Sequence, residues 1–268
     1  MSASSVYARP RIVTRLGDCF FYHTMDVPGH GRVKGLYDLR DRVDEHLGGV
    51  DFKNKRVLEI GTADGFFCFE LEKRGADVVA YDLSERDPWD VVPYARDDHE
   101  KFLNERRKGV RALNNAFWLN HRLLRSKARM SYGTIYEIPK GLGLFDVTTI
   151  GCVLLHLRDP FGALQRALRL TRETVVVTEM HRSDPALRLL GEISGPFMQF
   201  CPEPKKRALK ETWWNLPPEL ILRFLAVLGF EKAEVSYHAA PHLKYGEKKF
   251  YTIVATRTQR LKRSVDPR

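Results

Sequence analysis

One segment constrains the fold of this chain more than any other: VLEIGTADGFF, which crosses from an apolar strand to a helix over residues 57–67. It places an acidic residue, Glu59, before small residues at alternate positions, Gly61, Ala63 and Gly65. Small residues at such a crossing let the backbone approach a ligand closely, and the free N–H groups of the following helix face that ligand. The segment therefore predicts a ligand-binding turn.

A second strand, DVVAYDL, places Asp82 at its end, 21 residues after Gly61. A carboxylate at that position can accept hydrogen bonds from both hydroxyls of a ribose. The dinucleotide fingerprint G-x-G-x-x-G is not met, because Ala63 stands at its second glycine and Phe66 at its third. The pattern thus indicates a nucleotide cofactor and counts against a pyrophosphate.

Strand-like and helix-like segments alternate along the rest of the chain. Apolar, β-branched runs predict strands over residues 56–61, 77–83, 128–132, 145–150, 175–180, 233–237 and 250–256. Helical spacing of apolar residues predicts helices over 36–47, 66–75, 161–170 and 218–228, and a longer helix after the polar loop at 84–98. The alternation predicts an α/β fold with a mostly parallel sheet covered by helices on both faces and a closing antiparallel hairpin.

The chain divides into two predicted parts. Residues 1–48 are expected to be an N-terminal segment, irregular up to about residue 36, with a helix that covers the active site. Residues 49–268 are expected to be the main domain. Its stretch at about 182–217 breaks the strand–helix alternation and contains two Pro-containing turns, so we expect a lid there.

The charge of the chain allows two kinds of partner. It has 44 Lys and Arg against 34 Asp and Glu, a formal net charge of +10, of which residues 257–268 supply +4. A basic balance favours anionic partners such as nucleic acid or phosphorylated metabolites. Because no RNA-binding motif or stripe of stacking aromatics is present, a nucleic acid is the less favoured partner and a small molecule the favoured one.

Four cysteines are widely spaced, with no C-x-x-C pair, which predicts reduced thiols and no zinc cluster. The N-terminus lacks the apolar stretch of a signal peptide, and no apolar run reaches membrane-spanning length. We therefore expect a cytoplasmic protein with no metal and no membrane partner.

The glycine turn resembles the E/D-x-G-x-G-x-G loop of class I S-adenosylmethionine-dependent methyltransferases, with Ala63 in place of the middle glycine. FDVTTIGCVLLHLRDP at 145–160 is similar to the fourth-strand segment of the same superfamily. With YHT at 22–24, YDLR at 37–40 and the pair Trp213–Trp214, the resemblance is strongest to the branch of tRNA wobble-uridine carboxymethyltransferase-like proteins and related biosynthetic methyltransferases. It covers roughly residues 20–256 and implies a Rossmann-like seven-stranded sheet with an antiparallel last strand.

The resemblance implies S-adenosylmethionine as the cofactor and a set of residues around it. The methionine part of the cofactor would be surrounded by residues of the glycine turn and the strand before it: Glu59, Gly61, Thr62, Ala63 and Gly65. Asp82 would hold the ribose, and the adenine would lie among Leu83, Thr134 and Ile135, with Thr134 where the superfamily often has an Asp. The residues bordering the sulfonium end would be Ile150, Gly151 and Cys152.

Methyl transfer to a hydroxyl or amine is helped by a base whose pKa lies near neutrality. The candidates for catalytic residues follow the predicted strand ends or lie in the N-terminal segment: His156, Glu179 and His23. Each has an alternative role, His156 in ordering its loop, Glu179 in capping a turn or holding the ammonium of the cofactor, and His23 in packing.

Aromatic side chains in and near the predicted lid could close over a planar or apolar acceptor, and we expect substrate contacts from Tyr22, Phe197, Trp213 and Trp214. The sequence therefore predicts a methyltransferase that acts on an oxygen or nitrogen of a small biosynthetic molecule. A tRNA-modifying methyl- or carboxymethyltransferase and a non-catalytic protein that binds S-adenosylmethionine remain as alternatives.

Overall fold

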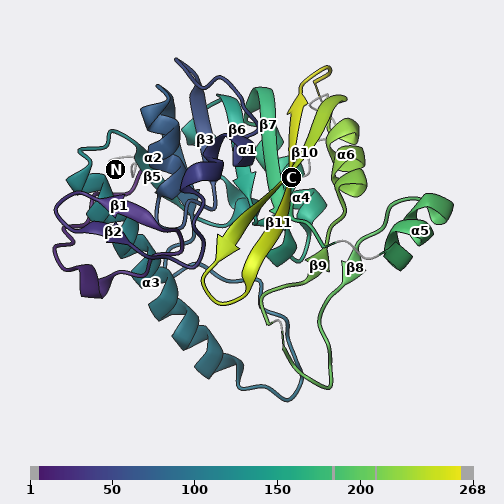
Figure 1. The fold of residues 1–268 in the computed structure, drawn as a ribbon, viewed down its shortest axis with the longest axis horizontal. Helices are drawn as coiled ribbons and strands as arrows, with labels where there is room; N and C mark the ends of the chain where they lie inside the picture. The colour runs from purple at the N-terminus through teal and green to yellow at the C-terminus, as the bar shows by residue number, and fades with distance from the viewer. Residues whose placement is uncertain (1–5, 183–184, 209, 261–268) are drawn as a thin grey trace.

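A computed structural model describes residues 6–182, 185–208 and 210–260 and confirms the predicted α/β fold. Seven strands form one sheet in the order β10-β11-β7-β6-β3-β4-β5 (Figure 1). The strands of this sheet are β3 (Arg56–Ile60), β4 (Asp77–Asp82), β5 (Arg129–Tyr132), β6 (Phe145–Gly151), β7 (Thr171–Met180), β10 (Lys232–His242) and β11 (Gly246–Thr256). The last strand, β11, pairs antiparallel with both of its neighbours, as predicted.

Helices cover both faces of the sheet. One face packs against α1 (Val43–His46), α2 (Phe66–Lys73) and α3 (His99–Leu123), together with the N-terminal segment. The other face packs against α4 (Pro160–Leu168) and α6 (Pro218–Val227). Alternate residues of the central strand β3 enter the two cores, with Val57 on the first face and Leu58 on the second. The sheet is therefore the middle of three layers, as the alternating sequence pattern requires.

The N-terminal part differs from the prediction. The expected helix over 36–47 reduces to α1 and a preceding 3-10 turn at Arg40–Arg42. Tyr37 is extended instead, because its backbone bridges His23 on one side and His242 on the other. These contacts outweigh the helical spacing of the local apolar residues. The stretch expected to be irregular contains a short antiparallel hairpin, β1 (Met25–Val27) and β2 (Gly31–Val33).

The predicted insertion at 182–217 is built as an excursion from the end of β7. It contains α5 (Pro185–Ser194) and a two-stranded ribbon of β8 (Gln199–Phe200) and β9 (Trp214–Asn215). Figure 1 shows α5 standing away from the three-layered body. The role of this stretch as a lid stays a prediction. Among the described residues, no helix is long and apolar enough to cross a lipid bilayer.

Candidate active site

The turn after β3 requires glycine at two positions. Gly61 has φ +81° and Gly65 has φ +88°, both in the left-handed region. A Cβ atom on Gly61 would lie 2.4 Å from Val153 Cγ2, and one on Gly65 would lie 2.5 Å from Phe69 Cε2. Ala63 also has a positive φ, +51°, which costs a non-glycine residue about 1–2 kcal/mol. The turn is thus strained and tightly packed, as expected of a loop that brings its backbone close to a ligand.

Asp82, at the end of β4, fastens this turn to the neighbouring strand. Its Oδ2 accepts a hydrogen bond of 2.7 Å from Ala63 N, and its Oδ1 accepts one of 2.7 Å from Leu83 N. Burial raises the pKa of Asp82 to about 6, while the two backbone donors oppose that rise. Each carboxylate oxygen has a further lone pair to offer. Asp82 can therefore shape the turn and still accept two ligand hydroxyl groups.

Glu59 lies beneath the turn with only 5% of its surface exposed. Its Oε2 has no hydrogen-bond partner among the described residues, and burial raises the pKa of Glu59 to about 8. A buried carboxylate without donors is costly, so such a group calls for an explanation. A cationic donor from a ligand, such as an ammonium group, would satisfy it.

One cavity of about 1010 Å³ opens at the carboxyl ends of β3, β4 and β6. It is lined by ten of the twelve residues predicted to contact the cofactor: Glu59, Gly61, Ala63, Asp82, Leu83, Thr134, Ile135, Ile150, Gly151 and Cys152. The other two, Thr62 and Gly65, lie outside its lining. Single-ligand pockets occupy about 300–1,000 Å³, so this cavity has room for a cofactor and a small acceptor together.

His23 lines the cavity and is held by Asp64, a fully buried residue of the glycine turn. His23 N donates a 2.7 Å hydrogen bond to Asp64 Oδ2, and His23 Nδ1 lies 2.7 Å from Asp64 Oδ1. The carboxylate accepts, so Nδ1 carries a proton. Asp64 therefore ties the N-terminal segment to the turn and fixes the imidazole.

His156 also lines the cavity and has its tautomer set by a carbonyl. Its Nδ1 lies 2.5 Å from the backbone oxygen of Glu211, which belongs to the predicted lid. Since a carbonyl can only accept, Nδ1 donates and Nε2 keeps a lone pair. Burial lowers the pKa of His156, which keeps the ring neutral. His156 therefore joins the lid to the end of β6.

Glu179 is buried and lies outside the cavity lining. Its Oε1 accepts a 2.7 Å hydrogen bond from Leu154 N, in the loop that follows β6. Burial raises the pKa of Glu179 to about 8, while backbone donors oppose the rise. This geometry is that of the turn-capping alternative for Glu179 rather than of a base in contact with an acceptor.

Of the four residues predicted to contact the substrate, only Tyr22 lines the cavity. Trp213 is 8% exposed, donates from Nε1 to Asp90 O and from its backbone N to Leu155 O, and so fastens the lid. Trp214 donates from Nε1 to Arg158 O, and Phe197 is half-buried in the lid. In this structure these three side chains belong to the lid and lie outside the cavity wall.

Several cavity residues were missed by the sequence reasoning. His46 lines the cavity and lies at the end of a helix predicted only from apolar spacing, and Asp64, which holds His23 from outside the lining, has no role in the glycine pattern. Arg106 reaches the cavity from α3, lies over the Trp89 ring at 4.2 Å and pairs with Glu211 of the lid. Their positions depend on contacts between distant segments, which local patterns do not encode.

A metal would need several ligands that converge. The part of the chain that the structure describes contains no group of three His, Cys, Asp or Glu side chains arranged to hold a metal ion.

Comparisons with known proteins agree with this geometry. Residues 31–216 match the family described as a methyltransferase domain, while no curated protein matches the chain. The solved N-terminal domain of EvdMO1, with bound S-adenosylhomocysteine, is 18% identical with a TM-score of 0.51, over 88% of this chain and 91% of that one. Magnesium protoporphyrin IX methyltransferase (ChlM) from Synechocystis PCC 6803, with the same ligand, is 14% identical with a TM-score of 0.50, over 82% of each chain.

These two structures share the fold of this protein, and the family match spans more than half of its length. The matched region contains the glycine turn, Asp82 and most of the cavity wall. The chain therefore belongs to the methyltransferase-domain family.

Proposed function

We propose that this enzyme transfers the methyl group of S-adenosylmethionine to an oxygen or nitrogen of a small biosynthetic acceptor. The observation that carries the proposal is the arrangement of Asp82 and the glycine turn on the wall of one cavity that is large enough for two ligands. The bound cofactor supplies an electrophilic methyl group, and the protein supplies position and surroundings.

The cavity wall fits the three parts of the cofactor. The unpartnered Oε2 of Glu59 suits the ammonium of the methionine part, and the spare lone pairs of Asp82 suit the ribose hydroxyls. Leu83 and Ile135 offer apolar contacts to adenine, beside a backbone fixed by the hydrogen bond of 2.9 Å from Tyr81 OH to Thr134 O. Two fold neighbours crystallised with S-adenosylhomocysteine support the same cofactor.

The side chains on the rest of the cavity wall indicate what kind of acceptor it would bind. Trp89, Tyr22 and Leu155 contribute apolar and aromatic surface, while Arg106 and His156 contribute polar groups. A few placed polar groups on an apolar wall are typical of a site for a small organic molecule. In this proposal His156 and His23 orient the acceptor through their free Nε2 atoms, and Glu179 holds the loop 152–156 in place.

Position and exclusion of water account for much of the rate in such a transfer, because the acceptor atom must meet the methyl carbon in line at about 3 Å. The N-terminal segment can supply both, since it is tied to the cofactor turn by the His23–Asp64 contact. The lid can supply the opposite wall through Glu211, which contacts His156 and Arg106.

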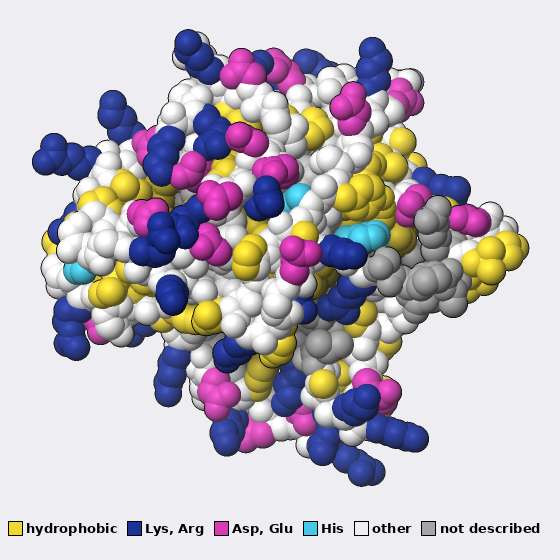
Figure 2. All heavy atoms as spheres, in the orientation of Figure 1, with side chains coloured by type: hydrophobic (Ala, Val, Ile, Leu, Met, Phe, Trp, Pro, Cys, Tyr) yellow, Lys and Arg dark blue, Asp and Glu magenta, His cyan; other side chains and the backbone are white. Residues whose placement is uncertain are grey.

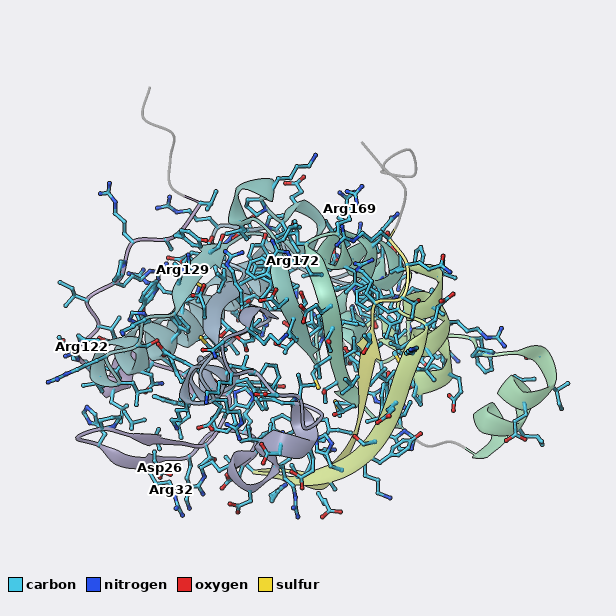
Figure 3. All side chains as sticks on the ribbon, turned by 90° about the horizontal axis from the view of Figure 1, so that it is seen from above. Asp26, Arg32, Arg122, Arg129, Arg169 and Arg172 are labelled. Atoms are coloured by element: carbon cyan, nitrogen blue, oxygen red, sulfur yellow. The ribbon has the colours of Figure 1, made fainter. Side chains whose placement is uncertain are left out.

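The charge distribution favours a small acceptor over tRNA. Lys and Arg side chains are interspersed with Asp and Glu over the face in Figure 2. Of the arginines labelled in Figure 3, Arg32 pairs with Asp26 and Arg129 pairs with Asp77. RNA-binding faces instead gather unpaired basic side chains into a patch or stripe. The net charge of +10 keeps tRNA as the second candidate acceptor.

A labelling experiment separates the candidates. The protein is incubated with methyl-¹³C S-adenosylmethionine and either a panel of small hydroxylated and aminated aromatic compounds or total tRNA. Labelled small molecules together with S-adenosylhomocysteine support the proposal. Label in the tRNA alone overturns it in favour of RNA modification, and absence of label despite cofactor binding supports the non-catalytic alternative.

Four free cysteines fit the cytoplasmic location that we propose.

A further inference from the structure

Two buried histidines, His46 and His238, form a pair that reaches from the cavity to the edge of the sheet. His46 Nδ1 lies 3.2 Å from His238 Nε2, and the residues are 5% and 9% exposed. His46 ends α1 beneath the N-terminal segment, while His238 lies on β10, the outermost strand. Residues 192 positions apart in the chain are thus joined through their rings.

The free nitrogen of His46 faces the end of the cavity where the methyl group is expected. A Cβ atom on Gly151 would lie 3.4 Å from His46 Nε2, and both residues line the cavity. Gly151 belongs to the set predicted to border the sulfonium end of the cofactor. His46 Nε2 makes no hydrogen bond to any residue in the described ranges, so it is available to a ligand in the cavity.

Both rings are held rigidly. The His46 ring stacks on Phe67 of α2, with centroids 4.3 Å apart and planes 12° apart. The His238 ring stacks on Phe250 of β11, with centroids 5.3 Å apart and planes 17° apart. Stacking on two different elements fixes the contact between the two imidazoles and leaves His46 little freedom to turn away from the cavity.

The surroundings keep His46 neutral. Burial, with His238 and His23 nearby, holds the pKa of His46 well below its usual value. Burial also lowers the pKa of His238, but the charge of Glu45 opposes that shift while the charge of Arg42 adds to it. A proton taken up by His46 is thus unfavourable there unless it is passed on, and of the two rings in the pair His238 is the one whose cation a carboxylate, Glu45, favours.

We propose that His46 is the general base of the transfer and that His238 relays the proton away from the cavity. This inference rests on the proposed function, because it needs an acceptor O–H or N–H beside Gly151. The acceptor atom forms a bond to the methyl carbon, and the electron pair of the broken carbon–sulfur bond stays on sulfur. The acceptor proton passes to His46 Nε2, and the proton on His46 Nδ1 passes to His238 Nε2.

The relay also explains an unpaired polar atom. His238 Nδ1 is buried and has no hydrogen-bond partner among the described residues. When His46 Nδ1 donates to His238 Nε2, the neutral His238 carries its other proton on Nδ1. After the transfer His238 is a cation, from which that proton can be lost toward the sheet edge. The unpaired atom then has a function that compensates for its cost.

The other cavity histidines are tied differently. His156 is hydrogen-bonded to the lid and His23 to the cofactor turn, so each ring fixes a segment that covers the cavity. His46 is tied to a second titratable ring, which gives a proton a place to go. His238 touches no predicted ligand and is therefore a positioning and relay residue.

Nitrogen NMR of ¹⁵N-histidine-labelled protein tests the pair without an acceptor. The signals of His46 and His238 are assigned by their loss in His46→Gln and His238→Gln, with His30→Gln, an exposed residue of the β1–β2 turn, as the control. At pH 7 His46 is expected to carry its proton on Nδ1. Its pKa should rise in His238→Gln, since the nearby ring that lowers it is removed. A proton on Nε2, or an unchanged His46 pKa, overturns the relay.

Once an acceptor has been identified, kcat and its pH dependence give a second test. His46→Gln should lower kcat by about 10²–10⁴-fold, the usual contribution of a general base, with the affinity for S-adenosylhomocysteine unchanged. His238→Gln should lower kcat less and move the acid limb of the pH profile to higher pH, and His30→Gln should change neither. A wild-type kcat in a folded His46→Gln protein overturns the inference. Failure of the wild-type protein to bind S-adenosylhomocysteine overturns the proposed function instead, and the NMR result still decides the geometry of the relay.

Discussion

The backbone N–H of Ala63 donates a 2.7 Å hydrogen bond to Asp82 Oδ2, which joins the glycine turn after β3 to the tip of β4. One carboxylate thus shapes the glycine turn, and in the proposed function it also accepts the ribose hydroxyls of the cofactor. The two strands are neighbours in the sheet, so the contact follows directly from the parallel β3–β4 pairing. The cofactor site is therefore set by the fold as much as by single side chains.

Gly61→Ala should destabilise the protein by about 1–3 kcal/mol, the cost of strained backbone at one residue. The reason is a φ of +81° and a new Cβ 2.4 Å from Val153 Cγ2. Urea unfolding measures the change. The second substitution Val153→Ala should restore part of the loss, because it removes the contacting methyl group. An equally unstable double variant would show that the contact does not matter.

Binding of S-adenosylhomocysteine at pH 7 should release close to one proton. Burial raises the pKa of Glu59 to about 8 in the free protein, so this carboxyl is mostly protonated there. A ligand ammonium beside it favours the charged form and lowers its pKa. Calorimetry in phosphate and in Tris should give different binding enthalpies, and Glu59→Gln should abolish the difference. Equal enthalpies in the wild-type protein would contradict this assignment of the ammonium site.

Glu179→Gln should stabilise the protein relative to the wild type as pH rises. The pKa of Glu179 is raised to about 8 in the fold, so the stability present below its unfolded pKa is lost as pH increases toward 8. The loss is at most about 1.4 kcal/mol per pH unit, and Gln cannot ionise. Melting temperatures of both proteins at pH 5, 6, 7 and 8 measure it. A difference that stays constant over this range would count against the buried, protonated Glu179.

His23 and Asp64 should act as one unit in stability. Asp64→Ala removes both hydrogen bonds between the N-terminal segment and the turn, whereas His23→Ala removes the one from Nδ1 and keeps the one from the backbone N–H. A double-mutant cycle is expected to give a coupling energy of about 0.5–3 kcal/mol, as for other residues in direct contact. Both single variants should also weaken cofactor binding, because the turn loses its support. Additive losses in the cycle would mean that the contact contributes nothing.

The wall of the proposed cofactor site could be placed from the sequence because its rules are local. A strand, a turn of small residues and a helix follow one another between Val57 and Phe67, and Asp82 ends the next strand in the chain. The order of such elements fixes which tips lie side by side. Ten of the predicted cofactor contacts therefore line one cavity.

The acceptor half could not be predicted in the same way. Tyr37 leaves the helical pattern because its backbone pairs with His23 and with His242, more than 200 positions along the chain. Trp213 lies outside the cavity because Asp90 O and Leu155 O hold it against the loop. The His46–His238 contact likewise depends on how α1 packs on β10. Such contacts arise from tertiary packing, and no local periodicity records them.

The most direct measurement of the central claim is a calorimetric titration of S-adenosylhomocysteine into the wild-type protein and two aspartate variants on β4. Asp82→Ala removes the carboxylate at the cavity, whereas Asp77→Ala removes one at the opposite end of the same strand, on the exposed surface. The account predicts binding to the wild type and to Asp77→Ala, and an affinity at least about 10²-fold weaker in Asp82→Ala, since two hydrogen bonds to a charged group are lost. No heat with the wild-type protein, or equal affinity in Asp82→Ala, would contradict it.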